Sequence, residues 1–115
     1  MKARRLFSAV AATIVVAAPG AAEAEESAKA HDARQAVVRP YRAWLERVAH
    51  CESGGRWHIN TGNGFYGGLQ FTLSSWRAVG GSGYPHQATK LEQMYRAVRL
   101  LRIQGRGAWP VCGNA

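Results

Sequence analysis

The chain has 115 residues, which leaves room for one domain and excludes a second, and it contains no internal repeats. It carries 15 Lys and Arg against 7 Asp and Glu, so its formal net charge is +8. This excess favours an anionic partner such as a wall polymer or a membrane surface, although solubility alone also explains it.

Residues 1–24 have the pattern of a secretory signal peptide. Positive residues at the start precede an apolar run at 6–18, and Pro19-Gly20 then interrupts that run before small residues suited to cleavage. The run is about a dozen residues long, too short to cross a bilayer core of roughly 30 Å as a helix. We therefore expect a secreted and cleaved protein rather than one with an uncleaved membrane anchor.

Residues 25–39 are rich in alanine and polar side chains and have only a weak apolar face. This composition predicts a linker or a loosely held helix. The folded domain is expected at 40–115, and its fold class is predicted as mainly α, with three or four helices and a glycine-aromatic loop.

The first helix of this domain is expected to begin near Pro40, because proline suits the first turn of a helix. Extending its apolar spacing by four residues reaches Glu52, and Gly54-Gly55 then ends the helix. The spacing i, i+3, i+4 and i+7 predicts one buried stripe made by Tyr41, Trp44, Leu45 and Val48.

Residues 56–71 combine glycines with aromatic and amide side chains and keep neither a helical nor a strand period. This mixture predicts a structured loop or a very short hairpin that can approach a ligand closely. Thr72 is a suitable N-cap for a short helix, which Gly80-Gly81 would end.

The last helix is expected to begin at Gln87 or Thr89 and to end at Gln104. Its inner stripe is predicted as Leu91, Tyr95, Val98 and Leu101 or Arg102. Arginines at near-helical spacing predict a basic flank made by Arg96, Arg99, Arg102 and Arg106. Glu46 and Glu92 also lie on predicted helices, where we expect them to face solvent.

The two cysteines, Cys51 and Cys112, are an even pair in a small exported chain, for which a disulfide is the expected state. A metal site made by these cysteines and nearby histidines is the alternative. No C-x-x-C or H-x-x-x-H spacing supports it, so we expect neither a metal ion nor another cofactor.

Glu52 is the candidate catalytic residue. A carboxyl group at the end of an apolar helical face is partly desolvated, so its pKa should be raised, as suits a general acid in glycoside hydrolysis. No second acidic residue lies close in sequence, so the usual scheme of two carboxylates lacks a partner. An ordinary surface glutamate at a frayed helix end is the alternative interpretation.

Side chains of the kinds that hold sugars follow Glu52 in the sequence. Aromatic rings stack on the CH faces of sugars, and amides bind hydroxyl and acetamido groups. Trp44 and Trp76 are expected to pack in the core instead. The predicted substrate-binding residues on these grounds are Trp57, Asn60, Asn63, Tyr66, Gln70, Tyr84, Gln104 and Trp109.

Several motifs resemble, in order, the catalytic domain of the resuscitation-promoting factors of actinobacteria: CESGGRWHINTGNGFYGGLQF, WRAVGG, GYPHQA and QGRGAWPVCG. The resemblance covers residues 41–113. It implies a compact lysozyme-like fold, similar to that of soluble lytic transglycosylases. It also implies cleavage of the β-1,4 bond between N-acetylmuramic acid and N-acetylglucosamine in peptidoglycan.

The resemblance assigns the catalytic glutamate to Glu52 and conserves the family's disulfide as Cys51–Cys112. It places family glutamines at Gln70 and Gln104. Ser75 stands where the family usually has threonine, which keeps the hydroxyl group and loses a methyl group. Arg106 departs from the closing motif, which commonly has tryptophan there, and so replaces a stacking surface with a charge.

We expect a secreted, monomeric, wall-associated glycosidase that acts on peptidoglycan strands with a single carboxylate, in wall remodelling and growth resumption. Relatives of this kind can cooperate with a cell-wall peptidase. Nucleic-acid binding and stable membrane insertion are not expected. A non-catalytic peptidoglycan-binding module and a cationic membrane-active protein are the other hypotheses; neither gives Glu52 a task.

Overall fold

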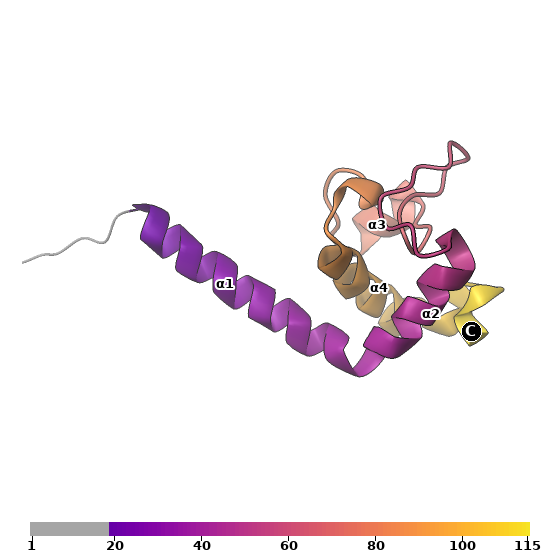
Figure 1. The fold of residues 1–115 in the computed structure, drawn as a ribbon, viewed down its shortest axis with the longest axis horizontal. Coiled ribbons are helices and arrows are strands. Elements are labelled where there is room, and N and C mark those ends of the chain that lie inside the picture. The colour runs from indigo at the N-terminus through magenta and orange to yellow at the C-terminus, as the bar shows by residue number, and fades with distance from the viewer. Residues whose placement is uncertain (1–18) are drawn as a thin grey trace, which may run out of the picture. The chain divides into compact units, whose positions relative to one another are not determined.

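The computed structural model describes residues 19–115, so most of the predicted signal peptide lies outside the described residues. The helix α1 (Pro19–Val38) is continuous (Figure 1). The apolar run at 6–18, which we expected Pro19-Gly20 to interrupt, lies outside the described residues, so this expectation stays a prediction. None of the helices in the described range is long and apolar enough to cross a membrane.

The described chain divides into two units, and the second begins at Asp32, within α1. The C-terminal end of α1 belongs to this second unit and packs on it: Val38 is fully buried, and Arg34 forms an ion pair with Glu92. The predicted segment 25–39 is therefore helical and partly docked, while the domain limits at 24 and 39 stay predictions.

The helix α2 (Arg42–Ser53) follows the short 3-10 helix η2 (Arg39–Tyr41), which contains Pro40. Its buried face contains Trp44, Leu45 and Val48 of the expected stripe, together with Ala49 and Ser53. Tyr41 lies before the helix, in η2, and is only half-buried. Gly54 ends the helix in the left-handed conformation, with φ 68°. Its N–H and that of Gly55 donate to the carbonyls of His50 and Ala49, which satisfies the last turn of the helix.

Two further helices occur as expected. Thr72 caps α3 (Leu73–Ala78) by accepting a hydrogen bond from the N–H of Ser75, at 3.2 Å. Thr89 caps α4 (Lys90–Gln104) by accepting one from Glu92, at 3.1 Å. The expected inner stripe of α4 was partly wrong, because the helix turns a different face inward, made by Gln93, Met94, Ala97, Val98 and Leu100. Leu91, Tyr95 and Leu101 pack at the edge of this face.

The C-terminal segment returns to α2, as Figure 1 shows for the yellow end of the chain. The disulfide between Cys51 and Cys112 joins them, with 5.7 Å between the Cα atoms. The indole N–H of Trp44 donates to the carbonyl of Gly113 at 3.0 Å, within the 3-10 helix η5 (Cys112–Asn114). The predicted fold class is confirmed: the domain is mainly α, consistent with a lysozyme-like fold, and has one disulfide.

Removing this disulfide by the double substitution Cys51→Ser and Cys112→Ser should lower the free energy of unfolding by about 4 kcal/mol, because the bond closes a loop of 61 residues. Urea unfolding of the variant and of the oxidised protein measures the difference. Reduction of the unmodified chain should reproduce it, and an unchanged midpoint in either experiment would contradict the prediction.

Candidate active site

Glu52 lies in the last turn of α2, where its side chain is half-buried. Burial raises the pKa of its carboxyl group, because the charged form loses part of its hydration. The neighbours of Glu52 along the chain are fixed on both sides: Cys51 by the disulfide, and Ser53 by a buried hydroxyl group. The carboxyl group is thus carried by an anchored turn rather than by a frayed helix end.

Ser53 connects this turn to the glycine-aromatic loop. Its hydroxyl group is placed 2.8 Å from the carbonyl of Gly68 and 3.0 Å from that of Ala49. Trp57 packs on Gly68 so closely that a Cβ atom there would lie 2.4 Å from the indole ring. Gly68 therefore has to be glycine, and the loop has to pass directly beside the end of α2.

Gln93, on α4, is fully buried and holds the same loop from the other side. Its Oε1 accepts from the N–H of Gly68 at 3.0 Å. Its Nε2 donates to the carbonyls of Trp57, at 2.8 Å, and Ala88, at 3.0 Å. One buried amide thus satisfies three backbone groups, each of which would otherwise lack a partner away from water.

The loop closes as the short hairpin that the sequence allowed. Tyr66 and Phe71 exchange backbone hydrogen bonds of 2.9 Å in both directions, and the turn between them ends at Gln70. Gln70 has φ 55°, the left-handed region that residues with a Cβ atom seldom adopt. Its Nε2 donates to the carbonyl of Gly67 at 3.0 Å. Backbone strain of this kind often accompanies functional sites, so the conformation of Gln70 is consistent with a role for this residue in the site.

Contacts between neighbouring residues connect the three segments that carry Glu52, Gln70 and Ser75. Ser53 bonds to the loop at Gly68, two residues before Gln70. Phe71 follows Gln70 and Trp76 follows Ser75, and the rings of these two residues lie 5.1 Å apart at 70°. The packing therefore links the segments that carry the three predicted site residues.

Other predicted substrate-binding residues line the loop itself. Asn60 and Asn63 are exposed, and their Oδ1 atoms accept from the N–H groups of Gly62, at 2.9 Å, and Phe65, at 3.3 Å. These bonds shape the loop and leave each amide NH2 group to face solvent. Tyr66 is half-buried, with its ring stacked on His86 at 5.5 Å.

The remaining predicted residues differ in how far they are exposed. Trp57 is half-buried, with Lys90 Nζ 5.2 Å from the ring centroid. Gln104 is exposed at the end of α4. Trp109 corrects our expectation, because only 4% of it is exposed. Its indole N–H donates to the carbonyl of Leu69 at 3.0 Å, so this ring supports the hairpin from the core and has no free face for a sugar.

The charged residues also differ from expectation. Glu46 is about half exposed and pairs with Lys90 at 2.7 Å. Glu92 does not face solvent: its side chain is 25% exposed and pairs with Arg34 and Arg96. Arg96 is therefore not part of the exposed basic flank that the sequence predicted, because its side chain is mostly buried in this pair. The Arg106 guanidinium lies 5.2 Å from the ring centroid of Trp44, so its charge contacts an aromatic face there.

Two structural residues of the site were missed by the sequence analysis. Ser53 lies inside the quoted CESGG motif, and its position one turn after Ala49 was the available signal. Gln93 gave no signal, because a polar residue on a predicted amphipathic helix is normally assigned to the solvent side. Within residues 19–115, no group of three or more His, Cys, Asp or Glu side chains is arranged to hold a metal ion.

Comparison with known proteins agrees with this geometry. Residues 39–112 match the model of the transglycosylase-like domain family. The chain belongs to this family, and specifically to the catalytic domains of resuscitation-promoting factors. It is 68% identical over 69 residues to the resuscitation-promoting factor Rpf of Micrococcus luteus, covering 60% of this chain and 31% of the relative.

Two further relatives have the same kind of match. The chain is 59% identical over 74 residues to resuscitation-promoting factor RpfE of Mycobacterium tuberculosis, covering 64% of this chain and 43% of the relative. It is 52% identical over 83 residues to resuscitation-promoting factor Rpf1 of Corynebacterium glutamicum, covering 70% and 42%. The chain thus spans less than half the length of the curated relatives described here.

Gln93→Ala should lower the free energy of unfolding by about 3 kcal/mol, because it leaves buried backbone groups of Gly68, Trp57 and Ala88 without a partner. Urea unfolding measures this loss. Gln104→Ala, the same change at an exposed position of the same helix, is the control and should alter stability by less than about 0.5 kcal/mol. Equal effects of the two substitutions would contradict the role given to Gln93.

Glu52→Gln should make the domain more stable at neutral pH. The raised pKa means that folding favours the protonated carboxyl group, so the charged form destabilises the fold once the pH exceeds the ordinary value of 4.5. Below that value both side chains are neutral, and the difference should vanish. Because the group is partly hydrated, we expect a rise in Tm of only about 1–3 °C at pH 7. Thermal unfolding at pH 4 and pH 7 tests the sign.

Proposed function

We propose that the domain is a secreted, muralytic glycosidase that cleaves the bond between N-acetylmuramic acid and N-acetylglucosamine in peptidoglycan. Membership of the transglycosylase-like family supports this class of enzyme. The observation that supports the catalytic assignment is which acidic residues form ion pairs and which does not. In the matched range 39–112 these are Glu46, Glu52 and Glu92, and two of the three are engaged in ion pairs.

Glu52 differs from the other two in its surroundings. Glu92 accepts from two guanidinium groups, which outweigh the effect of burial and hold its pKa below the ordinary value. Glu46 bonds to an ammonium group. Glu52 is half-buried and has a raised pKa, so it retains a proton to a higher pH than an exposed glutamate does. This is the property that a general acid requires.

The mechanism uses this one carboxyl group twice. Glu52 gives its proton to the glycosidic oxygen as the bond from that oxygen to C1 of the muramoyl residue breaks. The electron pair of the bond leaves with the oxygen, and positive charge develops at C1. The carboxylate then takes a proton from water, or from the muramoyl 6-hydroxyl group, as that oxygen bonds to C1. Water gives a hydrolysed product, and the hydroxyl group gives a 1,6-anhydro sugar.

Side chains on the loop support binding of the glycan. Gln70, Ser75 and Gln104 would supply polar contacts, and Asn60 and Asn63 would add amide donors at the exposed edge of the loop. Trp57 and Tyr66 would offer partly exposed rings. We do not assign sugar binding to Trp109, because its ring is buried.

The same proposal includes the setting in which the enzyme acts. A cleaved signal peptide would deliver a monomeric domain to the cell wall, where the substrate is a peptidoglycan strand. Wall remodelling and growth resumption, in cooperation with a cell-wall peptidase, are the expected outcome. The positive charge of the chain is consistent with an anionic wall.

Glu52→Gln should reduce the release of soluble muropeptides from purified walls by at least about a hundredfold, because general acid catalysis contributes on that order. Mass spectrometry of the released fragments gives both the rate and the product type, since anhydro and hydrolysed products differ by one water. Glu46→Gln is the matched control and should keep normal release.

Unchanged release by the Glu52→Gln variant would refute the catalytic assignment. Binding to walls by the unmodified protein without any released product would instead favour a non-catalytic peptidoglycan-binding module.

A further inference from the structure

The domain contains a cavity whose wall reaches the glycine-aromatic loop at one point, where Tyr84 packs on Tyr66 with 5.4 Å between the ring centroids. It has a volume of about 440 Å³ and is bordered by α4, by the segment that joins α3 to α4, and by the end of α1. None of the residues proposed for glycan cleavage lines it. Its lining residues on α1 and α4 are Arg34, Glu92 and Arg96, and those on the joining segment include Ser82, Tyr84 and Gln87.

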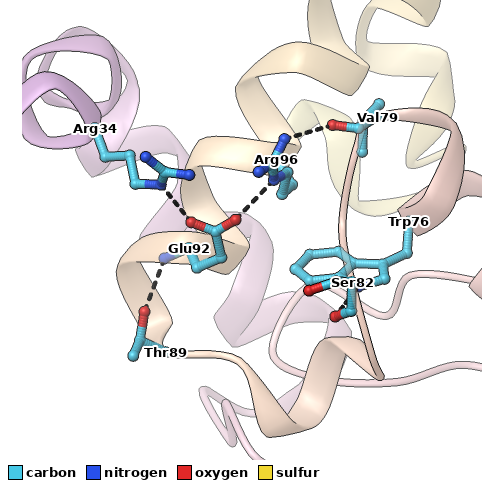
Figure 2. A network of polar contacts seen from close by, with 7 residues as sticks. All are labelled: Arg34, Trp76, Val79, Ser82, Thr89, Glu92 and Arg96. Carbon is cyan, nitrogen blue, oxygen red and sulfur yellow. Dashed lines mark hydrogen bonds and ion pairs between the residues drawn. The ribbon is translucent and has the colours of Figure 1, made fainter. Parts of the chain in front are cut away.

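The charges in this cavity do not balance. Figure 2 shows Glu92 between two guanidinium groups, Arg34 on one side and Arg96 on the other. Arg96 Nε donates to Glu92 at 2.7 Å, and its Nη1 donates to the carbonyl of Val79 at 2.8 Å. Two positive groups and one negative group leave one net positive charge at the cavity wall.

Donors remain for a ligand. A guanidinium group has five N–H donors, and the two bonds of Arg96 direct only its Nε and Nη1. Among residues 19–115, the Nη2 group of Arg96 donates to no other side chain or backbone carbonyl. Ser82 and Gln87 are exposed and add a hydroxyl group and an amide at the rim. Trp76 also borders the cavity, but its ring is fully buried, and its indole N–H donates to the carbonyl of Ser82 at 3.0 Å (Figure 2), so this N–H connects the rim residue Ser82 to the core.

We propose that this cavity binds the carboxylate end of a short peptide. A guanidinium group matches a carboxylate, and the amide and hydroxyl groups at the rim match a peptide backbone. The volume falls in the range of small-ligand sites. Glu92 then acts as an internal competitor, because it shares Arg96 with the incoming carboxylate.

This site is separate from the proposed catalytic function, and it draws on a residue outside the matched domain. Arg34 precedes the matched range, 39–112, so one of the two cations comes from the helix before it. Peptides attached to wall fragments and free peptides have the same carboxylate chemistry. The experiment has to distinguish these two sources.

The test is an NMR titration of the full chain that follows the indole N–H of Trp76. N-acetyl-dialanine should shift this resonance in a saturable manner, and N-acetyl-dialanine amide, which lacks the carboxylate, should bind at least about tenfold more weakly. Equal binding of the two probes, or no shift with either, would overturn the proposal. Wall fragments with and without their peptides form a second arm, in which binding only with the peptide identifies the wall as the source.

Substitutions on α4 separate recognition from folding. Arg96→Gln should weaken binding of N-acetyl-dialanine about fivefold, and Arg99→Gln, an exposed position outside the cavity, should not change it. Glu92→Gln should tighten binding about threefold, because it removes the competing carboxylate. A merely structural role for Glu92 predicts no tightening, and that result would count against the site even if Arg96→Gln unfolds.

Binding should also be unchanged in the Glu52→Gln variant, which keeps this cavity intact. Retained binding with lost muropeptide release would show two independent sites. If the Glu52→Gln variant lost binding of N-acetyl-dialanine, the cavity would not be separate from the active site. If the variant kept both peptide binding and muropeptide release, only the catalytic proposal would be refuted.

Discussion

The buried amide of Gln93 is the contact on which the geometry of the active-site loop depends. It bonds at once to Gly68 in the hairpin, to Trp57 in the loop and to Ala88 before α4. Ser53 holds Gly68 from the side of α2, and the Trp109 indole holds Leu69 from the C-terminal segment. A loop without regular structure is thereby fixed by side chains from three separate parts of the domain.

This fixation explains how a small domain keeps a partly desolvated carboxyl group in place. The end of α2 is held by the disulfide at Cys51 and by the hydroxyl group of Ser53, which fixes the backbone that carries Glu52. The other two acidic residues of the matched range are neutralised by ion pairs. The sequence suggested a mechanism with one carboxyl group because no second acid lies near Glu52. The ion pairs of the other two acids are consistent with that mechanism as well.

The ion pairs of Glu92 also determine the charge of the cavity that α4 borders. Glu92 draws Arg34 and Arg96 together beside Trp76, and burial with incomplete charge balance produces a small, positively charged cavity. Because Glu52, the proposed catalytic residue, lies on α2 and does not line this cavity, recognition of a glycan and of a carboxylate would be free to operate separately.

The sequence by itself determined the helices, their caps and the disulfide, because glycines, threonines and apolar spacing act locally and an even cysteine pair has one partner choice. It also indicated Glu52 as the catalytic candidate, through a stripe that ends on an acidic residue, and that role stays a prediction. Only the tertiary structure decided which face of α4 is buried, that Gln93 is a core residue, and that Trp109 supports the hairpin. Those outcomes depend on which backbone groups distant segments bring to a side chain, and no local pattern records that information.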